Sequence, residues 1–536
     1  MRRDDSFTPS RLINVNPKGL GEDVVLEDKI PPGSAYIALS YCWGNYEPEC
    51  LTTRDTVDYN MQRIPWSALP ATFQDAVKFT RGLGIKYLWI DSICIIQRDL
   101  EDWIQQAGQM FHIYKNAYVT LAALYGRSST SGLRAISMEN QLFKIADLSL
   151  DEICYPVYIR RSHYQQLGKT GSYWDNIQNM SGWGPLLCRA WTYQERMISP
   201  RVLYFTESEI IFQCFSRVEC ECGAVESEGT RSAAFGKAKY FNSLFDIEET
   251  HDQCISPPAE EHGTDSKEQR DRIVRTWRED VLRGFSGLML SRPSDRLPAI
   301  GAMAEQFQQF RPGETYLAGL WSGSLIEDLL WKCGFIEDVR PKNTLDRLGS
   351  VPTWSWASLQ SKVFFPDDRE REELLPAVEI LEARCEYKEN NPFGVLESSK
   401  LILRGKLLPC LAIWGDQEEC RIFVSCPGDP AGPLQQLHKW GGVTEMVHMD
   451  HDATGYQSIP WQQNIYILEM KKGYGEGYLI RHYLILRRED KTEDIFSRAG
   501  SPIYKLDVER GSEKTAKGKF FDFFDEQSII TDCKSI

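Results

Sequence analysis

Two carboxylates in this sequence are placed where they could do chemistry. Asp91 is the only charged residue between Tyr87 and Ile96, in the apolar run IKYLWIDSICII, and Glu195 lies in the segment CRAWTYQERMISP. A buried carboxylate can polarise a substrate or exchange a proton with it, because burial and neighbouring groups move its pKa toward neutrality. Asp91 and Glu195 are therefore the candidate catalytic residues.

Each carboxylate also has a purely structural interpretation. An isolated buried carboxylate is costly, so Asp91 could instead cap the loop that follows it and organise Ser92 and Gln97. Glu195, next to Arg196, could belong to a structural ion pair. Both interpretations predict damage when Asp91 is replaced by Ala, so stability has to be measured beside activity.

Aromatic and polar residues near the two carboxylates are candidate ligand contacts. Large rings just before Gly44 suit either a flat ligand or core packing. On a helix that carries Glu195, positions 191, 194 and 195 are neighbours. The candidate ligand-binding residues are Tyr41, Trp43, Gln97, Gln106, Trp191, Gln194 and Arg196.

Metal and nucleotide motifs are weak or missing. Cys214, Cys220 and Cys222 lack a well-spaced fourth ligand, and His448, Asp450 and His451 have no HExxH context. The chain contains no GxGxxG, GxxxxGK[ST] or GxSxG motif. We therefore predict no metal and no cofactor.

Strand and helix patterns alternate around the candidate residues. Apolar runs at 35–44, 85–96 and 117–124 predict strands. Between them, LPATFQDAVKFTRGLG predicts a helix with Thr72 as its N-cap, and an apolar stripe after Asp99 predicts another. The fold class is α/β, with a mainly parallel sheet flanked by helices. Asp91 then lies at the carboxyl end of a central strand, where such sheets bind ligands.

The rest of the chain predicts two further parts. A helix at CRAWTYQERMIS ends at Pro200, ahead of the strand VLYF, and residues 222–268 are acidic and typical of a surface loop. Beyond residue 350 the apolar runs shorten to strand length, which indicates a β-rich part. The predicted domains are 30–210 (α/β), 211–350 (acidic insertion and helical extension) and 351–536 (β-rich).

Composition narrows the possible partners and the compartment. The net charge is −15 without a basic run, which argues against nucleic acid and anionic lipid. The chain has no apolar segment of membrane-spanning length, and its N-terminus is polar. Fifteen scattered cysteines fit a reducing compartment. We expect a cytoplasmic protein whose partner is a small molecule or a protein in a pocket at the strand ends, with self-association possible.

Three segments together resemble the heterokaryon-incompatibility (HET) domain family of filamentous fungi. They are YIALSYCWG, LPATFQDAVKFTRGLGIKYLWIDSICIIQ with DWIQQAGQMFHIYKNAYVTLAA, and CRAWTYQERMISPRVLYF, and the resemblance covers roughly residues 30 to 360. The matching residues are Tyr41, Trp43, Gly44, Asp91, Cys94, Gln97, Asp102, Trp103, Met110, Tyr114, Ala117, Trp191, Gln194, Glu195 and Arg196.

The resemblance implies a role in non-self recognition and programmed cell death. It also implies a remote similarity to TIR domains, some of which cleave NAD with a glutamate. Two positions depart from the family pattern: Arg98 stands where an Asp is common, and Gln106 stands where a Glu is common. Glutamine carries neither an exchangeable acid proton nor a negative charge, so we expect no NAD cleavage.

Two functions remain open. The first is a stand-alone HET protein that acts in incompatibility or cell death through protein contacts. The second is a cofactor-independent enzyme of secondary metabolism that promotes cyclisation, dehydration or (hetero-)cycloaddition of an apolar natural product. In that enzyme, aromatic side chains would shape the substrate and Asp91 or Glu195 would polarise it.

Overall fold

A computed structural model describes most of the chain. The described residues are 6–45, 47–133, 143–150, 153–159, 184–206, 209–221, 237, 263–333, 351–366, 374–414, 420–424, 435–436, 448–449, 462–475, 478–490, 495–501, 503–507 and 529–535. They divide into two compact units. Unit 1 comprises residues 1–276 and 298–306, and unit 2 comprises residues 277–297 and 307–536.

Unit 1 is built on a mixed eight-stranded sheet with the order β10-β9-β8-β5-β3-β4-β1-β2. Its strands are β1 (Leu12–Asn14), β2 (Val25–Glu27), β3 (Tyr36–Ser40), β4 (Tyr87–Trp89), β5 (Val119–Ala122), β8 (Arg201–Phe205), β9 (Ile210–Cys214) and β10 (Val218–Cys220). The four central strands, β4, β3, β5 and β8, are parallel. The other pairs are antiparallel.

The prediction of a mainly parallel sheet is therefore right for the centre and wrong for the edges. The parallel pairs need crossover connections, whereas β8, β9 and β10 follow one another through short turns. Short connections can join only antiparallel neighbours. The edge formed by β8, β9 and β10 is consequently antiparallel.

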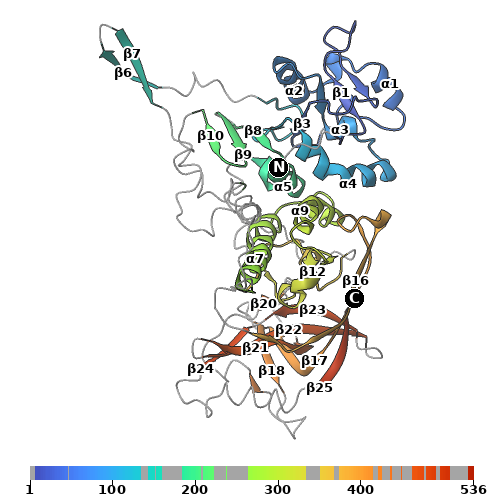
Figure 1. The fold of residues 1–536 in the computed structure, drawn as a ribbon, viewed down its shortest axis with the longest axis vertical. Coiled ribbons are helices and arrows are strands. Elements are labelled where there is room, and N and C mark those ends of the chain that lie inside the picture. The colour runs from blue at the N-terminus through green and yellow to red at the C-terminus, as the bar shows by residue number, and fades with distance from the viewer. Residues whose placement is uncertain are drawn as a thin grey trace. The chain divides into compact units, whose positions relative to one another are not determined.

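Two crossover helices connect the central strands, and Figure 1 shows them beside the sheet. Helix α2 (Ala71–Gly82) lies between β3 and β4, and α4 (Leu100–Asn116) lies between β4 and β5. The side chain of Asp99 caps α4 by accepting the backbone N–H groups of Glu101 and Asp102, which agrees with the helix predicted after Asp99. Helix α5 (Ala190–Ile198) ends before Pro200 and leads into β8, also as predicted.

Two local predictions are wrong. Helix α2 begins at Ala71 after Pro70, so Thr72 is not its cap. The Thr72 hydroxyl instead accepts the N–H of Gly132, which is distant in sequence. The strand predicted over 85–96 is short, because β4 ends at Trp89 and Asp91 begins the one-turn helix α3 (Asp91–Cys94).

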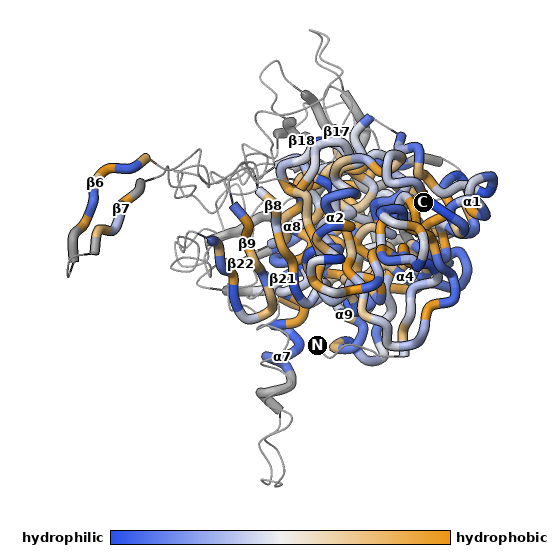
Figure 2. The backbone as a smooth tube through the Cα atoms, turned by 90° about the horizontal axis from the view of Figure 1, so that it is seen from above, coloured by the Kyte–Doolittle hydropathy of each residue, from blue (hydrophilic) through white to orange (hydrophobic). Residues whose placement is uncertain are grey.

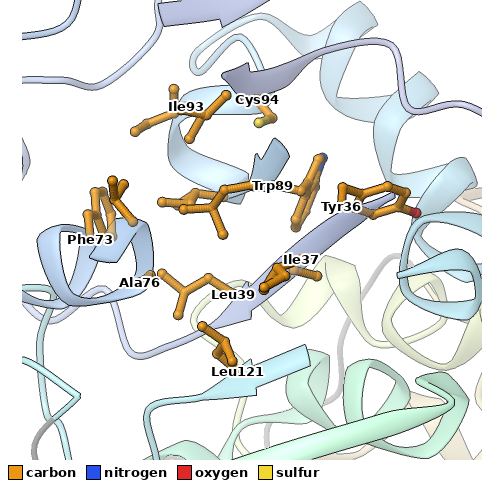
Figure 3. Close-up of a cluster of buried hydrophobic side chains, with 14 of the residues drawn as sticks. Tyr36, Ile37, Leu39, Phe73, Ala76, Trp89, Ile93, Cys94 and Leu121 are labelled. Carbon is orange, nitrogen blue, oxygen red and sulfur yellow. The ribbon is translucent and has the colours of Figure 1, made fainter. Parts of the chain in front are cut away.

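The core of unit 1 lies between these strands and helices. Figure 3 shows Ile37 and Leu39 from β3, Phe73 and Ala76 from α2, Trp89 from β4 and Leu121 from β5 gathered into one cluster. Trp89 is fully buried, and its ring meets the edge of Tyr114 at 5.6 Å between centroids. Continuous burial on both faces explains why the central strands are apolar throughout.

Between β5 and α5, the described part of unit 1 contains a separate hairpin. Strand β6 (Phe143–Leu150) pairs with β7 (Ile153–Ile159) in an antiparallel register. The predicted acidic loop lies largely outside the described residues. From Gly263 onward, that loop prediction is wrong, because helix α7 (Gly263–Arg275) begins there.

Unit 2 is β-rich, as predicted for the C-terminal part. An eleven-stranded sheet includes β16 (Glu379–Tyr387), β17 (Leu396–Trp414), β21 (Gln462–Gly475), β22 (Tyr478–Asp490) and β25 (Ile529–Ser535), in antiparallel pairs. The remaining strands of this sheet are β15 (Leu375–Pro376), β18 (Cys420–Val424), β19 (Gln435–Gln436), β20 (His448–Met449), β23 (Ile495–Ser501) and β24 (Ile503–Asp507).

A small aromatic cluster precedes this sheet in the sequence of unit 2. Strands β11 (Tyr316–Leu317) and β12 (Leu320–Trp321) form a hairpin whose two turn residues, Ala318 and Gly319, have φ of 46° and 97°. The indole N–H groups of Trp277 and Trp356 both donate to the Gly319 carbonyl, at 3.3 and 3.1 Å. The turn is thus held by two buried tryptophans.

We predict that Gly319→Ala destabilises unit 2 by about 2 kcal/mol or more. A side chain at positive φ costs about 1–2 kcal/mol, and its Cβ would lie 2.5 Å from Trp356 Nε1. Thermal unfolding followed by tryptophan fluorescence measures the loss. The matched control is Gly287→Ala, whose Cβ would make only ordinary contacts with Lys362; equal effects of the two substitutions would contradict the prediction.

Candidate functional site

The candidate residues gather where the central parallel strands end. Tyr41 follows β3 directly, and Asp91 follows β4 after one intervening residue. Glu195 lies on α5, the helix that leads into β8. Because parallel strands end at one edge of a sheet, Tyr41 and Asp91 meet there. Glu195 precedes its strand and joins them through Ser40, the last residue of β3, which is hydrogen-bonded to its carboxyl.

Two hydrogen bonds, one from Trp43 and one from the backbone of Ser92, hold the carboxylate of Asp91. Trp43 Nε1 donates to Asp91 Oδ2 at 2.7 Å, and the backbone N–H of Ser92 donates to Oδ1 at 2.7 Å. The Tyr41 hydroxyl in turn donates to Ser92 Oγ at 2.9 Å. Burial raises the pKa of Asp91, and the Trp43 and Ser92 hydrogen bonds and the charge of Arg189 oppose that rise.

Glu195 is the second carboxylate of this site, with only 8% of the residue exposed. Burial raises its pKa to about 7; hydrogen bonds from Ser40 and Tyr114 oppose the rise, while the charge of Asp91 adds to it. The two carboxylates are therefore electrostatically coupled. A group with a pKa near 7 is protonated in part of the molecules at neutral pH and can donate a proton.

Arg189 supplies the positive charge of the site. Its Nη1 donates to the Tyr41 carbonyl at 2.9 Å, and its charge lowers the pKa values of both Asp91 and Glu195. Sequence reasoning missed Arg189 as well as Ser40 and Tyr114. Arg189 directly precedes the helix that carries Trp191 and Glu195, and this position in the sequence could have identified it as a site residue.

Aromatic rings surround the two carboxylates. The rings of Tyr41 and Trp43 are nearly parallel, with an interplanar angle of 8° and centroids 6.5 Å apart. Trp191, one turn before Glu195 on α5, meets the edge of Trp103 from α4 at 6.2 Å. Trp43, Trp103 and Trp191 are each partly exposed, and Trp43 and Trp191 also pack against the core of unit 1.

The remaining candidates have structural contacts. The Gln97 amide donates to the carbonyls of Asp91 and Ile95 at 3.1 and 3.0 Å, and so holds the loop that carries Asp91. Gln106 is buried and donates to Ser10 Oγ at 3.1 Å. Gln97 therefore has a structural role in the loop after Asp91. Gln106 contacts the N-terminal segment instead.

Gln194 and Arg196 lie on other sides of α5. Gln194 is buried, and its Oε1 accepts the N–H of Ala302 at 3.3 Å. The Arg196 guanidinium lies over the ring of Tyr193, 5.1 Å from its centroid. The structure thus brings Tyr41, Trp43, Asp91 and Glu195 together, and it directs Gln194 and Arg196 toward different neighbours.

The described residues contain no group of three or more His, Cys, Asp or Glu side chains that could hold a metal ion. Cys222, Asp450 and His451, which belong to the weak metal patterns, lie outside the residues that the structure describes. Among the described helices, none is long and apolar enough to cross a membrane.

The fold and the site define an α/β domain in which Asp91 follows β4 and Glu195 reaches the end of β3 from α5. Residues 36–195 match the model of the family described as heterokaryon incompatibility protein (HET), and this chain therefore carries a HET-family domain. The matched region contains Tyr41, Trp43, Asp91, Arg189 and Glu195. No curated protein and no solved structure matches the chain.

We predict that replacing Glu195 by Gln makes stability less dependent on pH. A carboxyl whose pKa rises from 4.5 to about 7 on folding binds its proton more tightly in the folded state. Glu195 therefore stabilises the folded state below about pH 4.5. This stabilisation, at most about 3 kcal/mol, is lost as the pH rises to about 7.

Unfolding midpoints measured between about pH 4 and about pH 8 test this expectation. The fall in stability across that range should be smaller in Glu195→Gln than in the wild type. Glu22→Gln, at an exposed position, is the control and should follow the wild type. Identical profiles for wild type and Glu195→Gln would show that Glu195 titrates normally.

A second prediction concerns the bond between Trp43 and Asp91. Trp43→Phe removes the indole donor and leaves a partly buried carboxylate oxygen without that partner, at a cost of about 1–3 kcal/mol. In an Asp91→Asn background the same substitution should cost less, because the acceptor is no longer charged. A double-mutant cycle of unfolding free energies measures this difference, and strictly additive losses would contradict the bond.

Proposed function

We propose that this protein acts in fungal non-self recognition and programmed cell death, in the cytoplasm and through protein contacts. The observation that carries the proposal is the HET match over residues 36–195. The candidate site, Asp91 and Glu195 with Tyr41, Trp43 and Trp191, is then the place where a small molecule or a protein segment binds and changes the state of the domain.

We also propose that the domain does not cleave NAD. Gln106 stands where relatives commonly have a glutamate, and its buried amide donates to Ser10. An amide cannot stabilise the positive charge that develops when a glycosidic bond breaks as a carboxylate does. This contact with Ser10 supports a role for Gln106 in holding the N-terminal segment.

The second candidate function is an enzyme of secondary metabolism. The observation that favours it is Glu195, whose carboxyl is buried, receives hydrogen bonds from Ser40 and Tyr114, and has its pKa raised to about 7. A partly protonated carboxyl beside Asp91 suits a cyclisation, dehydration or (hetero-)cycloaddition that needs an acid and an oriented substrate. Partly exposed tryptophan rings would shape an apolar substrate.

Controlled expression in a filamentous fungal host distinguishes the two functions. If the cell-death proposal holds, induction of the wild type should arrest growth, and Asp91→Asn should relieve the arrest at equal protein level. Glu22→Gln is the matched surface control and should arrest growth like the wild type. Healthy colonies at high levels of folded wild type would contradict the cell-death function.

Two biochemical assays accompany this test. Incubation of the purified protein with NAD should release no nicotinamide, and robust release would overturn the argument from Gln106. Comparison of extracted metabolites between wild-type and Glu195→Gln strains addresses the enzyme. A natural product that disappears in Glu195→Gln, in colonies that grow normally, would establish the second function in place of the first.

A further inference from the structure

The hairpin of β6 and β7 exposes an unusual number of apolar side chains. Thirteen large hydrophobic residues are exposed within the described part of the chain, and five of them lie on this short hairpin. They are Phe143, Ile145, Leu148, Tyr155 and Val157, with exposed fractions of 67, 56, 51, 47 and 36%. Scattered exposed hydrophobic residues are ordinary, but a concentration of this kind marks an interaction surface.

The strand register places Leu148, Tyr155 and Val157 on one face. Leu148 pairs with Tyr155, and Ala146 pairs with Val157. Side chains two residues apart on a strand point the same way, so these pairs form one apolar face. Ile145 is the extra residue where the register shifts between Lys144 and Ala146.

The opposite face of the hairpin, its polar face, carries the charged side chains. Asp147 lies there and pairs with Pro156, and Cys154 lies on the same face as Pro156. Lys144 Nζ lies 2.7 Å from Asp147 Oδ1. Figure 2 shows hydrophilic and hydrophobic residues following one another along β6. The hairpin is therefore amphipathic, like a strand pair that covers a core on one side and faces water on the other.

An isolated two-stranded hairpin is only marginally stable in water. Its exposed apolar face therefore calls for a partner. We propose that this face, defined by Phe143, Ile145, Leu148, Tyr155 and Val157, packs against the same face of a second copy of this chain. The two hairpins lie face to face about a two-fold axis, and the proposal is independent of what the carboxylate site does.

Three observations favour a second copy as the occupant. The first is area: five large side chains exposed to this degree present at most about 500 Å² per copy, so a symmetric pair buries at most about 1,000 Å², the size of a weak dimer interface. The second is shape, because the apolar faces of two β-ribbons can pack against one another at the spacing of two sheets. A two-fold interface is formed by the same patch on both copies, so the patch has only to fit against itself.

The third observation is charge. The whole chain carries a net charge of −15, so two copies repel one another over most of their surfaces. The described residues of the hairpin carry one positive and one negative side chain, Lys144 and Asp147, which form an ion pair on the polar face. The apolar face is therefore a surface at which two copies meet without bringing like charges together.

Sedimentation of the purified full-length protein tests the proposal. The wild type should show a monomer–dimer equilibrium between about 1 μM and about 100 μM, the affinity expected of an interface of this size. Leu148→Lys combined with Tyr155→Lys should weaken the dimer at least about 10-fold. The matched control is Asp147→Lys with Cys154→Lys, two described positions on the polar face, which should leave the dimer unchanged.

Further measurements keep the proposal open to refutation. Leu148→Ser with Tyr155→Ser adds no charge and should also weaken the dimer, while circular dichroism confirms that each variant is folded. A wild type that stays monomeric throughout, or equal weakening by both lysine pairs, would overturn the proposal. Monomeric protein that sediments with phosphatidylcholine and phosphatidylserine vesicles, and loses this binding in Leu148→Lys with Tyr155→Lys, would assign the face to a membrane surface instead.

Discussion

The cost of withdrawing two carboxylates from water, Glu195 almost completely and Asp91 in part, constrains the arrangement of the HET-type domain. An unpaired buried carboxylate is expensive, and two that lie close together raise each other's pKa. Asp91 accepts from Trp43 and from the Ser92 backbone, and Glu195 is hydrogen-bonded to Ser40 and Tyr114. The partners come from β3, α3, α4 and their flanks, so the site exists only when the parallel centre of the sheet is assembled.

The loop that carries Asp91 is fixed from several directions. Arg11 Nε donates to the Cys94 carbonyl at the end of α3, and its Nη2 lies 2.6 Å from both carboxylate oxygens of Asp102. Asp102 also accepts the N–H of Ile96. Arg11 lies outside the matched residues 36–195, so residues before the HET region contribute to the position of the candidate site.

Sequence patterns predicted the parts of this domain that depend on local chemistry. The helix that starts after Asp99, the helix that ends before Pro200 and the place of Asp91 near a strand end are all readable from neighbours in the chain. Thr72 was misassigned because its hydroxyl is used by Gly132, a contact that only the folded chain creates. Tertiary contacts of this kind override local capping preferences.

The composition of the site was predicted less completely than the fold. Tyr114 belongs to the apolar stripe of α4, and periodicity identifies the ring that packs on Trp89 but not the hydroxyl that reaches Glu195. Arg189 and Ser40 act through residues distant in sequence. Conversely, Gln194 and Arg196 were grouped with Glu195 because they adjoin it, although neighbouring positions on a helix point in different directions.

The coupling between Asp91 and Glu195 is the central claim, and infrared titration of the carboxyl groups tests it most directly. Subtracting the spectra of Glu195→Gln from those of the wild type isolates Glu195, whose pKa should be about 7. In an Asp91→Asn background the same subtraction should give a lower value, because the neighbouring negative charge is gone. A Glu195 pKa near 4.5, or one that Asp91→Asn leaves unchanged, would contradict the account.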